Sequence, residues 1–156
     1  MLASLAALVP ALPLVAALWL GATILFGQAS GEIHERRTSR IVLAALGASF
    51  ASALMLAVAR FTGALPDAVS FGRWLSSGNY RVDLVFATDA LSLTLAVLAS
   101  LLCLLVARFA VNYMHREAGF HRLFMVVSLF AAAMALLVTG GTAVLTFIGW
   151  DIAGLC

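Results

Sequence analysis

Charged side chains are scarce in this chain of 156 residues. It contains no lysine, and only 10% of its residues are charged, whereas soluble domains carry about 25%. Nine arginines and seven acidic residues leave a formal net charge of +2, which is too small to neutralise many phosphates. These shortages exclude an ordinary cytosolic enzyme, a disordered tail and a nucleic-acid binder.

Cysteine is also rare, because only Cys103 and Cys156 are present. Two cysteines are too few for a disulfide framework or a zinc site. The three histidines, His34, His115 and His121, fall in polar segments and are expected to be solvated. No spacing typical of metal ligation, Gly-rich phosphate loop or hydrolase motif occurs. We therefore expect this chain to bind no metal and no cofactor.

Apolar residues are abundant: they make up 64% of the chain, and the mean hydropathy is +1.11. Four windows carry no charge, at 4–26, 41–59, 90–107 and 123–150. A membrane-spanning helix needs about 20 apolar residues, and the Gly140-Gly141-Thr142 breaker divides the last window. We predict an all-α membrane protein with four complete transmembrane helices and a truncated fifth, at about 4–26, 41–60, 89–109, 123–140 and 142–156.

The fifth predicted helix is short. From Thr142 to Cys156 it reaches only ~22 Å, whereas the hydrocarbon core of a bilayer is about 30 Å thick. We interpret residues 1–156 as a single transmembrane domain that forms the N-terminal fragment of a larger bundle.

The arginines indicate an orientation in the membrane. Segments 27–40 and 108–122 fall on one side of the predicted spans and together carry Arg36, Arg37, Arg40, Arg108, Arg116 and Arg122. The opposite side carries Arg60, Arg73 and Arg81. By the positive-inside rule, the first two segments face the cytoplasm and the N-terminus faces outward.

The segment 61–88 is not apolar enough to cross a membrane. Its residues Tyr80, Val82, Leu84 and Phe86 alternate with Arg81, Asp83 and Val85, which is typical of a half-buried strand. A second strand is expected at 71–75, before the Ser76-Ser77-Gly78-Asn79 turn. The pattern predicts a short external β-hairpin between the second and third helices, and the alternative is an irregular loop.

Asp151 is the one charged residue well inside a predicted span. It lies about nine residues, or ~14 Å, into the fifth helix. A carboxylate at this depth costs about 2.5–3.5 kcal/mol on insertion scales, so it is usually paired and often marks an ion pathway. We interpret Asp151 as a candidate proton-relay residue. The alternative is a structural aspartate bonded to a neighbouring helix.

Three runs of residues resemble a known family. They are TDALSL at 88–93, NYMHREAGFHRLF at 112–124 and FIGWDIAGLC at 147–156. Together they resemble the N-terminal part of the antiporter-like L subunit of bacterial respiratory complex I, an NADH:quinone oxidoreductase. The A subunit of Mrp-type sodium/proton antiporters is similar.

This resemblance implies a proton-translocating subunit of the bacterial inner membrane. Such a subunit lies in the lipid bilayer beside other membrane subunits and carries no redox centre, because other subunits of the complex handle NADH and quinone. In the family, a glutamate in a "GWE" motif pairs with a lysine on a later helix, and Asp151 takes its place in Gly149-Trp150-Asp151. Alternative functions are a subunit of an Mrp-type cation/proton antiporter or of an energy-coupled inorganic-carbon uptake system, and a non-conducting membrane scaffold.

Overall fold

Five helices and one two-stranded sheet make up the computed structural model, which describes residues 2–27, 32–77, 80–117 and 119–156. The elements, in chain order, are α1 (Leu2–Leu25), α2 (Glu32–Phe61), β1 (Ala68–Ser77), β2 (Tyr80–Ala87), α3 (Ala90–Tyr113), α4 (Phe120–Thr139) and α5 (Ala143–Leu155). Four of the helices are long and apolar enough to cross a membrane, and α5 is shorter. The predicted class is therefore confirmed: a helical membrane protein with a hairpin between the second and third helices.

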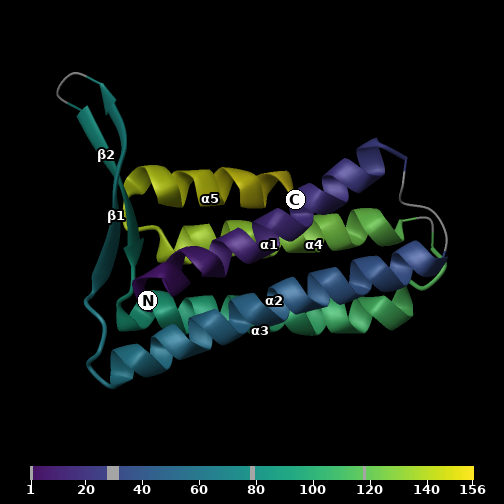
Figure 1. Cartoon of the computed structure of the whole chain (residues 1–156), viewed down its shortest axis with the longest axis horizontal. Helices are drawn as coiled ribbons and strands as arrows, with labels where there is room; N and C mark the ends of the chain where they lie inside the picture. Colours follow the sequence, from purple (N-terminus) through teal and green to yellow (C-terminus); the bar gives the residue numbers. More distant parts are fainter. Residues whose placement is uncertain (1, 28–31, 78–79, 118) are drawn as a thin grey trace.

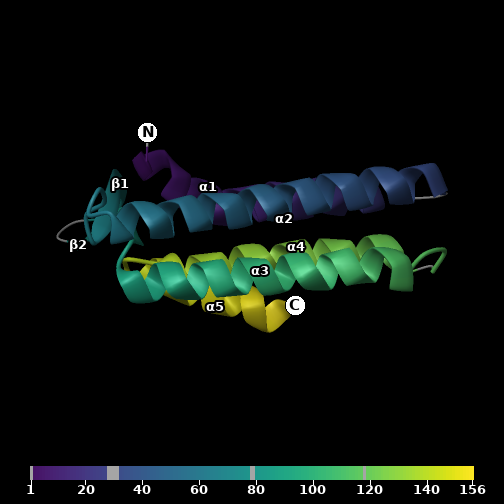
Figure 2. The ribbon, with the colours of Figure 1, turned by 90° about the horizontal axis from the view of Figure 1, so that it is seen from below.

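The four long helices pack side by side in two layers (Figure 2). One layer holds α1 and α2, the other holds α3 and α4, and α5 packs against α4 on the outside of the bundle. The hairpin lies across one end, next to the N-terminus and the start of α5 (Figure 1). Both arginine-rich segments lie at the other end, as the sequence predicts, while the side of the membrane that this end faces stays a prediction.

Two helices extend further than the predicted spans. Helix α2 begins at Glu32 rather than near residue 41, and α3 continues to Tyr113. The prediction of a loop over 27–40 is therefore wrong for residues 32–40. Arginine and glutamate have good helix propensity. The first charged residue beside an apolar run therefore indicates where the helix emerges from the membrane, and the helix itself can continue further.

Small residues line the buried face of α4. Its buried positions include Ala131, Ala132, Ala133 and Ala135, and small side chains let helix backbones approach closely within a membrane. The two hydroxyl groups on this face donate to their own helix, Ser128 to the Phe124 carbonyl at 2.8 Å and Thr139 to the Ala135 carbonyl at 2.7 Å. No polar hydrogen from these two side chains is left without an acceptor.

A proline in α1 explains one contact between helices. Pro13 has no N–H, so it cannot donate to the carbonyl of Val9 four residues earlier. The buried hydroxyl of Ser49 on α2 donates to that same carbonyl at 2.6 Å. Neighbouring helices commonly satisfy backbone groups that a proline frees within a membrane, and here the bond also joins α1 to α2.

Replacing Ser49 with alanine is expected to destabilise the protein by about 1–2 kcal/mol, because a buried carbonyl loses its donor. Ser52→Ala is the matched control, since Ser52 is also buried on α2 but donates only to the Ala48 carbonyl of its own helix. The control is expected to change stability by less than about 0.5 kcal/mol. Thermal unfolding in detergent, followed by circular dichroism, measures both, and equal losses would contradict the role of Ser49.

The predicted β-hairpin is confirmed. Strands β1 and β2 pair antiparallel from Ala68 opposite Ala87 to Ser77 opposite Tyr80, with a register shift near Gly72, whose φ is 95°. Phe86 is buried and Asp83 is exposed, as the alternating pattern predicts. The Gly78 and Asn79 positions of the predicted turn lie outside the described residues.

The start of α3 is fixed to the chain that follows α2. The buried Thr88 hydroxyl donates to the Pro66 carbonyl at 2.6 Å, and the Thr88 N–H donates to the Asp67 carbonyl at 2.8 Å. Asp89 is the N-cap and accepts from the N–H groups of Leu91 and Ser92 at 3.1 and 3.2 Å. Hydrogen bonding, first from the Ser92 side chain, lowers the pKa of Asp89. The TD pair of the TDALSL run thus has a structural role.

Candidate functional site

Asp151 is the ninth residue of α5, the helix that follows the Gly140-Gly141 turn. Thr142 caps this helix, because its side-chain oxygen accepts from the Leu145 N–H at 3.4 Å. The Thr146 hydroxyl donates to the Thr142 carbonyl at 3.2 Å one turn later. Along the helix axis Asp151 lies about 12 Å from the first residue of α5, and its depth in a membrane stays a prediction.

The hairpin holds the start of α5 in place. The Gly141 N–H donates to the Val85 carbonyl of β2 at 2.8 Å, and Gly140 forms a bridge with Phe86. A Cβ atom on Gly141 would lie 2.7 Å from Val85 Cγ1 and 2.8 Å from the Val85 oxygen. The two glycines therefore do more than end α4: they let the turn approach the sheet closely enough for this hydrogen bond.

Close packing on α4 fixes the rotation of α5. Gly149 is buried, and a Cβ atom there would lie 2.5 Å from the Leu137 nitrogen and 2.9 Å from the Ala133 oxygen. Only glycine allows the two backbones to be this close. Because Gly149 must face α4, the direction of every other side chain on α5 follows.

Asp151 consequently points away from the bundle. It follows Gly149 by two residues, a rotation of about 200° around the helix, and it is exposed. Phe147 and Trp150, on the same outward side, have 61% and 68% of their surface exposed. The carboxylate thus lies on an otherwise apolar outer face, where a bilayer or another helix would meet it.

Within the described part of the chain, the side-chain carboxylate of Asp151 makes no hydrogen bond and no ion pair. Arg60 forms an ion pair with Asp67 at one end of the bundle, and Glu35 contacts His115 at the other. The alternative of a structural aspartate bonded to a neighbouring helix therefore finds no partner on α1 to α4. The role of Asp151 as a relay residue stays a prediction.

A polar cluster that the sequence did not predict lies at the opposite end. His115 Nδ1 is 3.1 Å from Glu35 Oε2, which also accepts from the Arg116 N–H at 3.4 Å. His121 Nδ1 is 3.1 Å from the hydroxyl of the buried Thr38. These contacts join the start of α2 to the α3–α4 connection.

The expectation that all three histidines are solvated holds for two of them and is wrong for the third. His34 and His115 are exposed, but His121 is partly buried, because α4 begins just before it and turns it towards α2. In the described residues, no three His, Cys, Asp or Glu side chains gather as a metal site requires. The signal that could have revealed the cluster is the NYMHREAGFHRLF run itself, in which His115 and His121 lie six residues apart.

Comparison with known proteins agrees with the motifs. A family model described as "NADH-Ubiquinone oxidoreductase (complex I), chain 5 N-terminus" matches residues 74–125. The chain is 29% identical, over 100% of its length, to NAD(P)H-quinone oxidoreductase chain 5 of Synechocystis sp., of which it covers 23%. It is 34% identical over 83 residues to NADH-quinone oxidoreductase subunit L of Escherichia coli, covering 53% of this chain and 14% of that protein. The chain is similar to the N-terminal part of the complex I L subunit.

The resemblance expected from the three sequence runs is therefore confirmed. The segment matched by the chain 5 family model contains most of the hairpin, all of α3 and the start of α4, whereas α5 lies beyond it. NADH-quinone oxidoreductase subunit L of Pseudomonas aeruginosa aligns with 85% of this chain at 28% identity, and the chain covers 22% of that protein. The chain thus spans less than a quarter of the length of these relatives.

The relatives and the structure also agree on location. Two of the relatives are bacterial subunit L proteins, and four helices of this chain can cross a membrane. Together they indicate a multi-pass protein of the bacterial inner membrane, as the sequence predicts.

Proposed function

We propose that this chain is part of a membrane subunit that translocates protons in an NADH:quinone oxidoreductase. The observation that carries the proposal is the lone carboxylate of Asp151 on the outward face of α5. The relatives named as subunit L or chain 5 of such oxidoreductases supply the reaction to which the proton movement is coupled.

The position of Asp151 supports a role in proton transfer. A carboxylate in hydrocarbon costs about 2.5–3.5 kcal/mol, so it is usually retained for a function. The contacts of Gly141 and Gly149 direct this carboxylate away from the bundle, which supports such a role. A carboxylic acid can bind a proton and release it again, which a relay requires. Its cationic partner belongs to a helix outside α1 to α4, on the apolar side that Phe147 and Trp150 share with Asp151.

The proposal also assigns partners and excludes redox chemistry from this chain. The subunit lies in the lipid bilayer and packs against other membrane subunits of the complex through the outer face of α5. It carries no redox centre, so NADH and quinone are handled by other subunits. The energy released when other subunits oxidise NADH and reduce quinone reaches Asp151 only through contacts between protein subunits.

Deleting the gene is expected to abolish proton uptake driven by NADH in everted membrane vesicles. A pH-sensitive dye reports the uptake, and a plasmid copy of the gene should restore it. NADH oxidation with ferricyanide serves as the control, because this acceptor takes electrons without needing the membrane subunits that move protons.

The same vesicles separate the proposed function from its alternatives. Loss of sodium-driven proton exchange with unchanged NADH-driven uptake would contradict the proposal and favour an Mrp-type antiporter. In whole cells, growth that comes to require added carbon dioxide, with NADH-driven proton uptake unchanged, would favour an inorganic-carbon uptake system. Unchanged uptake by every driving force would exclude a proton-translocating role.

A further inference from the structure

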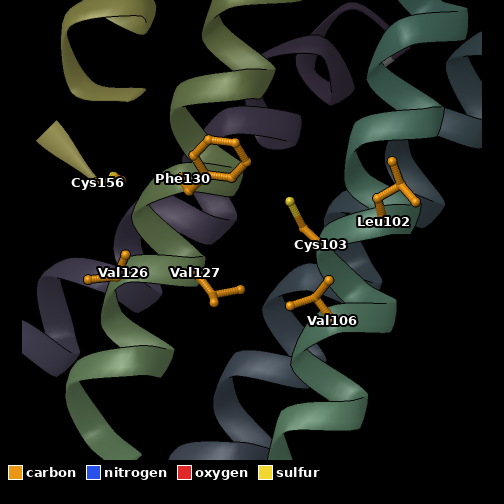
Figure 3. Close-up of a pocket in the computed structure, with 7 residues that line it drawn as sticks. All are labelled: Leu102, Cys103, Val106, Val126, Val127, Phe130 and Cys156. Carbon is orange, nitrogen blue, oxygen red and sulfur yellow. The ribbon is translucent and has the colours of Figure 1, made fainter. Parts of the chain in front are cut away.

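An apolar groove runs between α3 and α4 on the outer face of the bundle, beside the end of α5 (Figure 3). The residues that line it are Leu102, Cys103 and Val106 on α3, Val126, Val127 and Phe130 on α4, and Cys156 just after α5. Its volume is about 390 Å³. A second hollow of about 280 Å³ shares Leu102, Cys103 and Phe130 with it and continues towards the hairpin end, as far as Leu95 and Val138. The two hollows share these three residues and are together called the α3–α4 groove below.

The length of the α3–α4 groove fits one leaflet of a bilayer. From Val126 to Val138 the groove follows α4 for twelve residues, or about 18 Å. Half of a hydrocarbon core is about 15 Å. An acyl chain of the leaflet at the arginine-rich end of the bundle could therefore lie along the groove through the full thickness of that leaflet.

The mouth of the α3–α4 groove carries positive charge. Arg122 lies one turn before Val126 on α4, so the two residues are neighbours on the helix surface, and Arg122 is exposed. Within the described residues, Arg122 forms no ion pair. The same end of the chain carries Arg36, Arg37, Arg40, Arg108 and Arg116 against Glu32, Glu35 and Glu117. Positive charge is therefore in excess at this end, and Arg122 lies one helical turn from a residue that lines the groove.

We propose that the α3–α4 groove binds an anionic phospholipid, with one acyl chain along the groove and the phosphate at Arg122. A guanidinium group can donate two parallel hydrogen bonds to a phosphate, and basic sites between membrane helices recognise anionic headgroups. A zwitterionic phospholipid offers the same acyl chains without the net charge, so the site prefers the anionic lipid. This proposal does not depend on the proton-translocation function.

Arg122→Gln is expected to remove this preference. The protein, purified from its own membrane with the subunits that stay bound, is exchanged into vesicles of equal parts phosphatidylglycerol and phosphatidylcholine. Native mass spectrometry then gives the ratio of the two lipids retained. We expect the wild-type protein to retain phosphatidylglycerol preferentially and Arg122→Gln to lower the ratio about tenfold, since losing a charge-assisted contact is worth at least about one decade in affinity.

Two further variants locate the site. Arg108→Gln is the matched control, because Arg108 lies about 200° around α3 from Val106, away from the groove, and it should keep the wild-type ratio. Val127→Trp fills the groove and should lower the ratio as Arg122→Gln does. Equal losses in both arginine variants would overturn the proposal in favour of general surface charge. An unchanged ratio in Val127→Trp would also overturn it, as would a wild-type protein without preference, the result expected if another helix fills the groove.

Discussion

Asp151→Asn is expected to reduce NADH-driven proton uptake by about tenfold or more, because general acid–base groups typically contribute about 10²–10⁴-fold to proton transfer. Asparagine keeps the shape of the side chain and cannot take up or release a proton. Asp151→Glu is expected to stay near the wild-type rate. It keeps the carboxylate, and on the exposed face of α5 the extra methylene meets no side chain of α1 to α4.

Proton uptake into everted vesicles measures both variants, with assembly checked on native gels. Asp83→Asn is the matched control, since it makes the same chemical change at an exposed carboxylate on β2, opposite Arg73 in the hairpin register. The control should pump like the wild type. If Asp151→Asn also assembles and pumps normally, Asp151 is no relay residue and the proposed mechanism is wrong.

Gly149→Ala is expected to destabilise the packing of α5 on α4 by about 1–3 kcal/mol. The new methyl group would lie 2.5 Å from the Leu137 nitrogen and 2.9 Å from the Ala133 oxygen, and backbone atoms cannot avoid it by changing a rotamer. The higher helix propensity of alanine returns at most about 1 kcal/mol. Because α5 must move away or rotate, the direction of Asp151 should change and proton uptake should fall as well.

Gly154→Ala is the control on the same helix. A Cβ atom at Gly154 meets no atom within 4 Å, so this change should be neutral or stabilise the protein by up to about 1 kcal/mol. Thermal unfolding in detergent should separate the two variants by several degrees, since 1 kcal/mol corresponds to about 2–4 °C in a chain of this size. Equal melting temperatures would show that the Gly149 contact does not fix α5.

Local sequence patterns were sufficient for the elements of the fold. Uncharged runs of about twenty residues located four spans, because a helix that crosses the hydrocarbon core needs about this many apolar residues. The alternation of Tyr80, Val82 and Leu84 with Arg81 and Asp83 predicted the hairpin, since side chains on a strand alternate between two faces. The exact helix ends could not be predicted in this way, because charge reports on contact with water and not on backbone hydrogen bonds, as residues 32–40 of α2 show.

The sequence likewise predicted one part of the candidate site, and the other part required the tertiary structure. The sequence by itself determined that a single carboxylate, Asp151, lies deep within an apolar helix. Only the tertiary structure decided that this carboxylate points outward, because the direction depends on contacts of Gly141 with Val85 and of Gly149 with Leu137. The pairing of His115 with Glu35 likewise joins residues 80 positions apart. Hydropathy and periodicity describe neighbours along the chain, whereas these contacts form between elements that meet only after the bundle has packed.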